Sequence, residues 1–148
     1  MNKVIIGIAG DKGAGKTTAV DVFSQYGFYK VSIMDKVEEF ASYLFSKDTL
    51  NNDKEAICDQ IRKKGISTCK SYWINLVLTS IPDNENMIVI DDIEESEVGH
   101  SPIELIEIFR PSVSKGKVYQ GTIIENNGSL KEFIAKVKSF IANNFDKK

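Results

Sequence analysis

Residues 10 to 17 have the types and spacing of a loop that binds phosphate. They read Gly10-Asp11-Lys12-Gly13-Ala14-Gly15-Lys16-Thr17, which matches the pattern G-x-x-x-x-G-K-[ST]. The glycines let the backbone turn tightly and present its N–H groups to phosphate oxygens. Lys16 can reach the β- and γ-phosphates of a nucleotide, and the Thr17 hydroxyl can ligate Mg²⁺.

A glycine-rich turn that matches the pattern by accident is the alternative. The motif, however, follows a strand-like run and precedes a helical pattern, which is the context that a phosphate-binding loop requires. We therefore predict that this segment binds ATP together with Mg²⁺. The residues expected at the nucleotide are Gly10, Asp11, Lys12, Gly13, Ala14, Gly15, Lys16, Thr17 and Thr18.

Two consecutive acids, Asp91 and Asp92, end the apolar run that starts at Met87. Hydrophobic residues followed by Asp at a strand end are typical of the position that holds Mg²⁺ beside a phosphate-binding loop. Because side chains alternate along a strand, we expect only one of the two acids to face the nucleotide. We favour Asp91 as the metal ligand, with Asp92 as the open alternative and Thr17 as a further ligand.

Arginine is scarce, since Arg62 and Arg110 are the only two among 19 lysine and arginine residues. A guanidinium fork clamps a transferring phosphoryl group better than an ammonium does, so both are candidate catalytic residues. Arg110 follows a predicted strand, where it would either contact the transferring phosphate or pair with a surface acid. Arg62 begins a basic segment that extends to Lys70, which indicates either a solvated helix face or a site where Arg62 and Lys70 bind an anionic acceptor.

Asp35 follows the second predicted strand and has two interpretations. It could bind the phosphoryl acceptor, because the carboxyl end of a strand is where ligands of α/β proteins lie. It could equally be the N-cap of a helix that begins near Lys36. The sequence leaves both open.

Length and composition restrict the class of protein. The 148 residues suffice for one domain, and we expect a single nucleotide-binding domain over residues 1–148. The net charge of −2 is unlike that of a nucleic-acid-binding protein. The sequence contains no run of about 18 apolar residues, the length that a membrane span requires. Cys58 and Cys69 indicate reduced thiols. We expect a cytoplasmic protein that binds a small-molecule nucleotide; a homodimer stays open.

Strand-like and helix-like patterns alternate along the chain. Apolar runs predict strands at 3–9, 28–33, 87–92, 103–109 and 117–124. Apolar residues at helical spacing predict helices at 16–26, 36–45, 56–65, 72–81 and 130–141, with a polar break at 47–53, a C-cap near Gly65 and an N-cap at Ser129. This order predicts a three-layer α/β sandwich around a five-stranded, mostly parallel sheet.

The same segments, taken in order, resemble the P-loop nucleoside and nucleotide kinases. The likeness is greatest to the deoxynucleoside monophosphate kinases of phages, with dephospho-CoA kinase as a near relative. It is carried by GDKGAGKTT, SIMDKVEEFASYLF, GISTCKSYWINLVLTSIP, MIVIDDI, IELIEIFRPS and TIIENNGSLKEF.

The resemblance implies a P-loop kinase-like fold and transfer of the γ-phosphoryl group of ATP to the phosphate of a nucleotide. It implies that Arg62 and Lys70 lie near the acceptor phosphate. Asn126, Asn127 and Gly128 would form the loop beside the donor base.

A second hypothesis is a nucleotide-binding switch that acts through a partner. The acidic segment from Glu94 to Glu97, where the kinases have arginine, and the scarcity of arginine favour it. Multiple turnover with an acceptor would distinguish the kinase from the switch.

Overall fold

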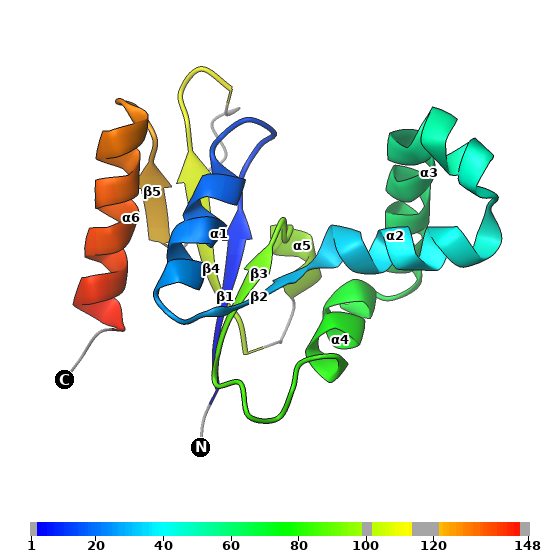
Figure 1. Ribbon diagram of the computed structural model, residues 1–148, viewed down its shortest axis with the longest axis horizontal. Coiled ribbons are helices and arrows are strands. Elements are labelled where there is room, and N and C mark those ends of the chain that lie inside the picture. The colour runs from blue at the N-terminus through cyan, green and yellow to red at the C-terminus, as the bar shows by residue number, and fades with distance from the viewer. Residues whose placement is uncertain (1–2, 99–101, 114–121, 146–148) are drawn as a thin grey trace.

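The computed structural model describes residues 3–98, 102–113 and 122–145. Strands and helices alternate through most of the chain (Figure 1). In chain order the elements are β1 (Val4–Ala9), α1 (Lys16–Gln25), β2 (Tyr29–Ser32), α2 (Ile33–Leu44), α3 (Lys47–Thr68), α4 (Tyr72–Thr79), β3 (Met87–Asp91), α5 (Glu95–Val98), β4 (Glu104–Phe109), β5 (Thr122–Glu125) and α6 (Leu130–Asn144).

The five strands form one sheet in the order β2-β3-β1-β4-β5, and every pairing in it is parallel. The central strand β1 is apolar and buried along almost its whole length, as expected of a strand covered on both faces. Its register places Val4 beside Met87 and Ile6 beside Glu104. The predicted five-stranded, mostly parallel sheet is confirmed, although residues 117–121 of the fifth predicted strand lie outside the described residues.

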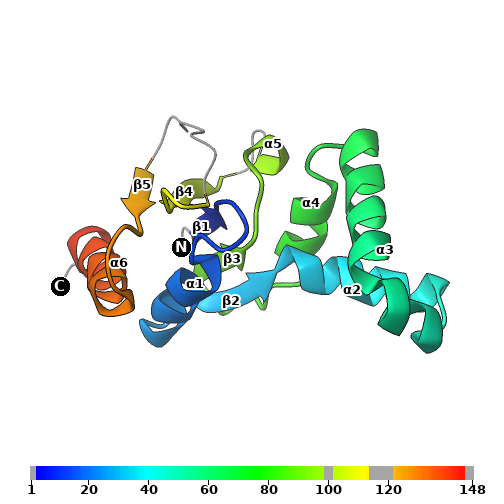
Figure 2. The ribbon, with the colours of Figure 1, turned by 90° about the horizontal axis from the view of Figure 1, so that it is seen from above.

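Helices cover both faces of the sheet and give three layers (Figure 2). On one face, Phe23 of α1 and Phe133 of α6 are buried against Ile6 and Ile108. On the other face, Trp73 of α4 belongs to a second apolar cluster, which also contains residues of β1, β3 and α2. Each face therefore has its own core.

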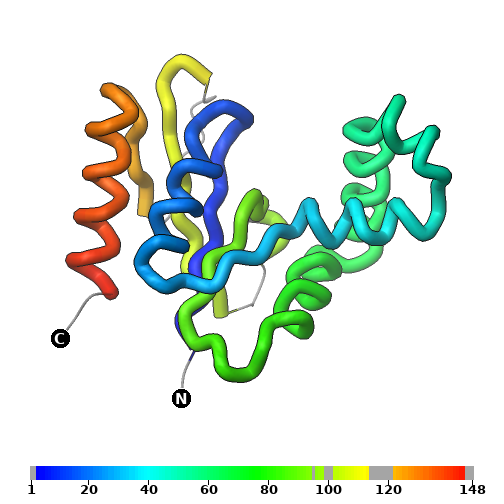
Figure 3. Tube along the Cα trace, in the orientation of Figure 1, coloured from blue at the N-terminus to red at the C-terminus, as the bar shows by residue number. Residues whose placement is uncertain are grey.

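Helices α2, α3 and α4, which lie between β2 and β3 in the chain, form an arm that projects from one edge of the sheet (Figure 3). The sequence predicts a polar break at 47–53, which is wrong because these residues are helical up to a kink at Asp53. It also predicts a short helix ending near Gly65, and a helical stretch does follow the kink, but it ends three residues later, at Thr68, with Cys69 as its C-cap. Helix α3 begins after Ser46, whose side chain accepts a hydrogen bond from the backbone N–H of Thr49, and its two helical stretches meet in a kink at Asp53. The break is reduced to one non-helical residue, Asp53.

Two helix starts show how the sequence places elements locally. Ser129 caps α6 as predicted, accepting a hydrogen bond from the backbone N–H of Glu132 at 3.1 Å. Asp35, in contrast, is not an N-cap, because α2 already begins at Ile33 with Ser32 as its cap. Within the described ranges, no helix is both long and apolar enough to cross a membrane.

Candidate nucleotide site

The predicted phosphate-binding loop connects β1 to α1 at the carboxyl end of the sheet. Gly10 and Gly15 have φ values of 150° and 111°, a region that side chains rarely adopt. A Cβ atom on Gly10 would lie 2.6 Å from the Ile108 carbonyl oxygen, and one on Gly15 would lie 2.8 Å from Asn126 Nδ2. Both glycines are therefore required by the close approach of β4 and of the segment after β5.

Asn126 fixes the loop from the opposite side. Its Nδ2 donates to the Ala14 carbonyl oxygen at 2.9 Å, and its backbone N–H donates to the Phe109 carbonyl oxygen. The resemblance placed Asn126 beside the donor base, whereas its observed contacts support the phosphate-binding loop. The neighbouring Asn127 is exposed and bonds to Glu125 and Lys136.

Lys16 is the first residue of α1 and contacts the end of β3. Its Nζ donates to Asp92 Oδ1 at 2.7 Å, with side chains 18% and 35% exposed. An open cleft of about 550 Å³ surrounds this pair. Its lining includes Lys12, Gly13, Gly15, Lys16, Thr17, Thr18, Asp91 and Asp92. Six of the nine residues predicted at the nucleotide therefore share one cleft with both strand-end acids.

Asp91 and Asp92 both line this cleft, and the expectation that only one of them faces the nucleotide stays a prediction. The alternation of a strand ends at Asp92, which has a φ of 57° and leaves the extended conformation. A left-handed residue other than glycine costs about 1–2 kcal/mol unless its surroundings hold it. Burial, followed by the charge of Asp92, raises the pKa of Asp91 above its ordinary value.

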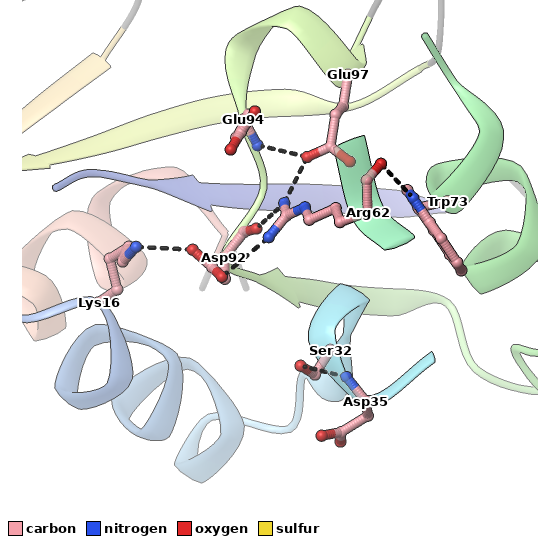
Figure 4. Close-up of polar contacts among 8 residues, drawn as sticks. All are labelled: Lys16, Ser32, Asp35, Arg62, Trp73, Asp92, Glu94 and Glu97. Atoms are coloured by element: carbon pink, nitrogen blue, oxygen red, sulfur yellow. Dashed lines mark hydrogen bonds and ion pairs between the residues drawn. The ribbon is translucent and has the colours of Figure 1, made fainter. Parts of the chain in front are cut away.

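Arg62 holds Asp92 from the arm (Figure 4). Its Nη1 donates to Asp92 Oδ2 at 3.1 Å, and its Nη2 donates to the Asp92 carbonyl oxygen at 2.6 Å and also to Glu97 Oε1. Arg62 is 5% exposed and Glu97 is fully buried. Burial alone would lower the pKa of Arg62, but the hydrogen bond and charge of Glu97, with the charge of Asp92, raise it.

The sequence analysis treats Glu97 only as part of an acidic segment and does not identify it as a residue of the site. Burial raises the pKa of the Glu97 carboxyl, and its bond to Arg62 partly offsets that effect. Its Oε1 also accepts a hydrogen bond from the backbone N–H of Glu94. A buried charge must be paired, but no local pattern in the sequence indicates which acid would pair with Arg62.

Three other predicted residues, Arg110, Asp35 and Lys70, are not among the residues that line the cleft. Arg110 is exposed after β4, and its Nη1 donates to the Gly13 carbonyl oxygen at 3.3 Å. Asp35 is exposed in the first turn of α2, and Lys70 is exposed in the turn between α3 and α4. Neither Asp35 nor Lys70 is among the residues that line the cleft around Lys16 or the cleft that adjoins it.

That adjoining cleft, of about 960 Å³, lies between the arm and the end of β3. It shares Met34, Glu55 and Asp92 with the first cleft. Its other lining residues are Glu38, Lys54, Ala56, Cys58, Asp59, Arg62 and Glu94. Carboxylates outnumber cations in this lining, and both cations form ion pairs, Lys54 with Glu38 and Arg62 with Asp92. We refer to these two spaces as the loop cleft and the arm cleft.

The donor atoms of the loop cleft fit a nucleotide with Mg²⁺. Backbone N–H groups and Lys16 suit phosphate oxygens, and hydroxyl and carboxylate oxygens are the ligands that Mg²⁺ prefers. Among the described residues, no three acidic, histidine or cysteine side chains converge as a protein-only metal site would require. A Mg²⁺ ion here would take most of its ligands from phosphate and water, as it commonly does.

No protein-family model and no curated protein sequence matches the chain. Among solved structures it is similar to TT1252 from Thermus thermophilus, with a TM-score of 0.58 and 15% identity over 97% of this chain and 99% of that one. It is also similar to an unliganded sugar kinase from Janibacter sp. HTCC2649, with a TM-score of 0.54 and 10% identity over 94% of each chain.

Dephospho-CoA kinase from Campylobacter jejuni matches with a TM-score of 0.49 and 16% identity, over 94% of this chain and 96% of that one. At such identities a likeness concerns architecture and not activity. Three observations agree on the fold: the parallel sheet, the phosphate-binding loop after β1, and the matching architectures of TT1252 and the sugar kinase. The chain has a P-loop kinase-like α/β fold.

Proposed function

We propose that the protein transfers the γ-phosphoryl group of ATP, with Mg²⁺, to a small acceptor bound in the arm cleft. The observation that carries the proposal is that the two clefts adjoin, since both are lined by Met34, Glu55 and Asp92. A donor in the loop cleft and an acceptor in the arm cleft would meet beside Lys16 and Asp92. Proximity of this kind is the main requirement of phosphoryl transfer.

Each part of the loop cleft has a role in this proposal. Residues 10–15 would hold the phosphates through backbone N–H groups, and Lys16 would turn from Asp92 to the β- and γ-phosphates. Thr17 and either Asp91 or Asp92 would hold Mg²⁺, which supplies charge neutralisation at the phosphates. An acceptor oxygen would attack phosphorus in line, forming the new P–O bond as the bond to the β-phosphate oxygen breaks.

The acceptor that we propose first is a deoxynucleoside or ribonucleoside monophosphate. The order of sequence segments shared with the nucleotide kinases supports this choice. A phosphate acceptor is already anionic near neutral pH, so no strong general base is needed in the arm cleft. Arg110, beside the Gly13 carbonyl, is our candidate for the cation that neutralises the transferring group.

The charges of the arm cleft favour a second candidate. Both of its lining cations are engaged by carboxylates, and its acids outnumber them. An anionic acceptor would have to displace those ion pairs, whereas a neutral or positively charged hydroxyl compound would not. In that case a carboxylate of the cleft would accept the hydroxyl proton during attack.

An acceptor panel tests the proposal. Purified protein would be assayed with ATP and Mg²⁺ against nucleoside monophosphates, dephospho-CoA, nucleosides, neutral sugars and amino sugars, with Lys16→Ala as the inactive control. Acceptor-dependent ADP release over many turnovers is the expected result. Binding of ATP without turnover on any of these acceptors would instead support the nucleotide-binding switch.

A further inference from the structure

Arg62 lies where the arm meets the acid that contacts the phosphate-binding loop. Its guanidinium donates to both the carboxylate and the carbonyl oxygen of Asp92, at 3.1 and 2.6 Å. These two bonds hold the side chain and the backbone of the one non-glycine residue with positive φ in the described chain. The conformation of Asp92 at the end of β3 is therefore fixed by a residue of α3.

The arm end of this connection is buried and joined to α4. The Arg62 carbonyl oxygen accepts a hydrogen bond from Trp73 Nε1 at 3.0 Å, which joins α3 to α4. Trp73 is 1% exposed and packs edge-to-face against Tyr72 and Phe40. A shift of α3 relative to the sheet would therefore move Arg62 and disturb Trp73 at the same time.

The other end of the connection is the nucleotide site. The two carboxylate oxygens of Asp92 have different partners: Oδ1 accepts a hydrogen bond from Lys16 and Oδ2 accepts one from Arg62 (Figure 4). When Lys16 turns to a phosphate, Asp92 loses one of its two cations and its remaining side-chain partner is Arg62. The balance of charge at Arg62 therefore depends on whether Lys16 is engaged by a nucleotide.

We propose that Arg62 is a positioning residue that couples the α2–α4 arm to the phosphate-binding loop through Asp92, and that it is not a ligand of the acceptor phosphate. Glu97, buried on the far side of the guanidinium, keeps Arg62 in place when the Asp92 contact changes. The inference rests on the proposed function only in taking the loop as an ATP site. It requires no particular acceptor.

A planar fork is essential to this role. Arg62 reaches two oxygens of Asp92 and one of Glu97 from two terminal nitrogens. An ammonium at the same position is a single point of charge and cannot keep this pattern. Arg62→Lys therefore conserves the charge of the buried cluster but loses the geometry that the coupling needs.

Trp73 can serve as an intrinsic fluorescence reporter, because it is the only tryptophan of the chain and donates a hydrogen bond to the Arg62 backbone carbonyl oxygen. In wild type, titration with ATP and Mg²⁺ should change Trp73 fluorescence. Calorimetry would measure ATP affinity separately, so that binding and coupling are distinguished. Neither measurement depends on turnover.

Three variants complete the experiment. Arg62→Lys tests the fork, and the double variant Arg62→Met with Glu97→Gln removes the cation without leaving Glu97 as an uncompensated buried charge. Lys63→Met is the matched control, because Lys63 is the neighbouring exposed cation and forms an ion pair with Asp59, one turn earlier in α3. Thermal melts would establish that each variant is folded.

We expect both Arg62 variants to bind ATP within about threefold of wild type but to lose the fluorescence response. In the acceptor assay their turnover should fall at least about tenfold, with a smaller change in acceptor KM. Lys63→Met should retain both properties. An unchanged fluorescence response in a folded Arg62 variant, or no response in wild type that binds ATP, would overturn the coupling.

The outcomes separate this inference from the proposed function. A wild-type protein that shows the fluorescence response but phosphorylates no acceptor would keep the coupling and overturn the kinase. A variant that raises acceptor KM at least about tenfold with normal kcat and a normal response would return Arg62 to acceptor binding. Failure of wild type to bind ATP would overturn both.

Discussion

Helices α3 and α4 pack so closely at Gly65 that there is no room for a side chain at this position, so Gly65→Ala is a sensitive test of the packing. Gly65 lies in α3 opposite Trp73 of α4. A Cβ atom here would lie 2.6 Å from Trp73 Nε1 and 3.0 Å from Tyr72 Cδ2, well inside ordinary contact. Trp73 is 1% exposed and donates to Arg62, so it cannot turn away without losing that bond.

The two possible effects of Gly65→Ala have opposite signs. Helix propensity alone favours alanine by about 1 kcal/mol. Overpacking in a filled core costs about 1–3 kcal/mol, and the loss of the Trp73 hydrogen bond costs about 1 kcal/mol. We therefore expect the free energy of unfolding to fall by about 1–3 kcal/mol, because the steric terms exceed the propensity gain.

Urea unfolding of Gly65→Ala beside Ser67→Ala measures this balance. Ser67 is exposed in the same helix, and its hydroxyl donates only to the nearby Lys64 carbonyl oxygen, so alanine there should change the free energy of unfolding by about 0.5 kcal/mol or less. A Gly65→Ala variant as stable as wild type, or more stable, would refute the reasoning. It would show that α4 moves freely away from α3.

Three further predictions concern the loop cleft. Lys16→Ala should lower turnover at least about a hundredfold in steady-state kinetics while changing the free energy of unfolding by less than about 1 kcal/mol, because the pair with Asp92 is partly exposed; equal activity would contradict the site. Arg110→Lys should lower turnover about tenfold or more, equivalent to 1.4 kcal/mol, if the fork meets phosphate; unchanged kinetics would assign Arg110 to a structural role beside the Gly13 carbonyl. The raised pKa of Asp91 means that its contribution to stability is present below the ordinary value of 3.8 and is lost as pH rises through the raised pKa. Asp91→Asn should therefore gain stability over wild type near pH 7 and lose that gain toward acid pH in urea unfolding, whereas a gain independent of pH would contradict burial of the charge.

Most of the fold could be predicted from local patterns in the sequence. The apolar runs that begin at Val4 and Met87 predicted two central strands, because a strand covered on both faces needs apolar side chains at every position. Ser129 was identified as a cap because its partner, the Glu132 backbone, lies only three residues away. The phosphate-binding loop was recognised for the same reason, since its residues are consecutive.

Predictions failed where the deciding contact lies far along the chain. Arg62 begins a basic segment, which favours either a solvated helix face or an acceptor site, but its partners are Asp92, which follows β3, and Glu97 of α5. The same guanidinium bonds to Asp92, whose left-handed φ ends the strand alternation at Asp91, so alternation does not orient the Asp92 side chain. The polar stretch at 47–53 resembled a loop, but Ser46 caps it and α2 packs against the helix that follows.

The position of β1 in the sheet has a consequence for synthesis on the ribosome. The first strand to be made is the central one, and its pairing partners begin only at Met87 and Glu104. Until both have emerged, an apolar strand with two unpaired edges waits in the nascent chain, where long-range pairing is slow and exposed edges invite association. The helical arm, made of contacts close in sequence, can form during that interval. We expect the arm to acquire structure first and the nucleotide site, whose loop begins where β1 ends, to appear only with the second half of the chain.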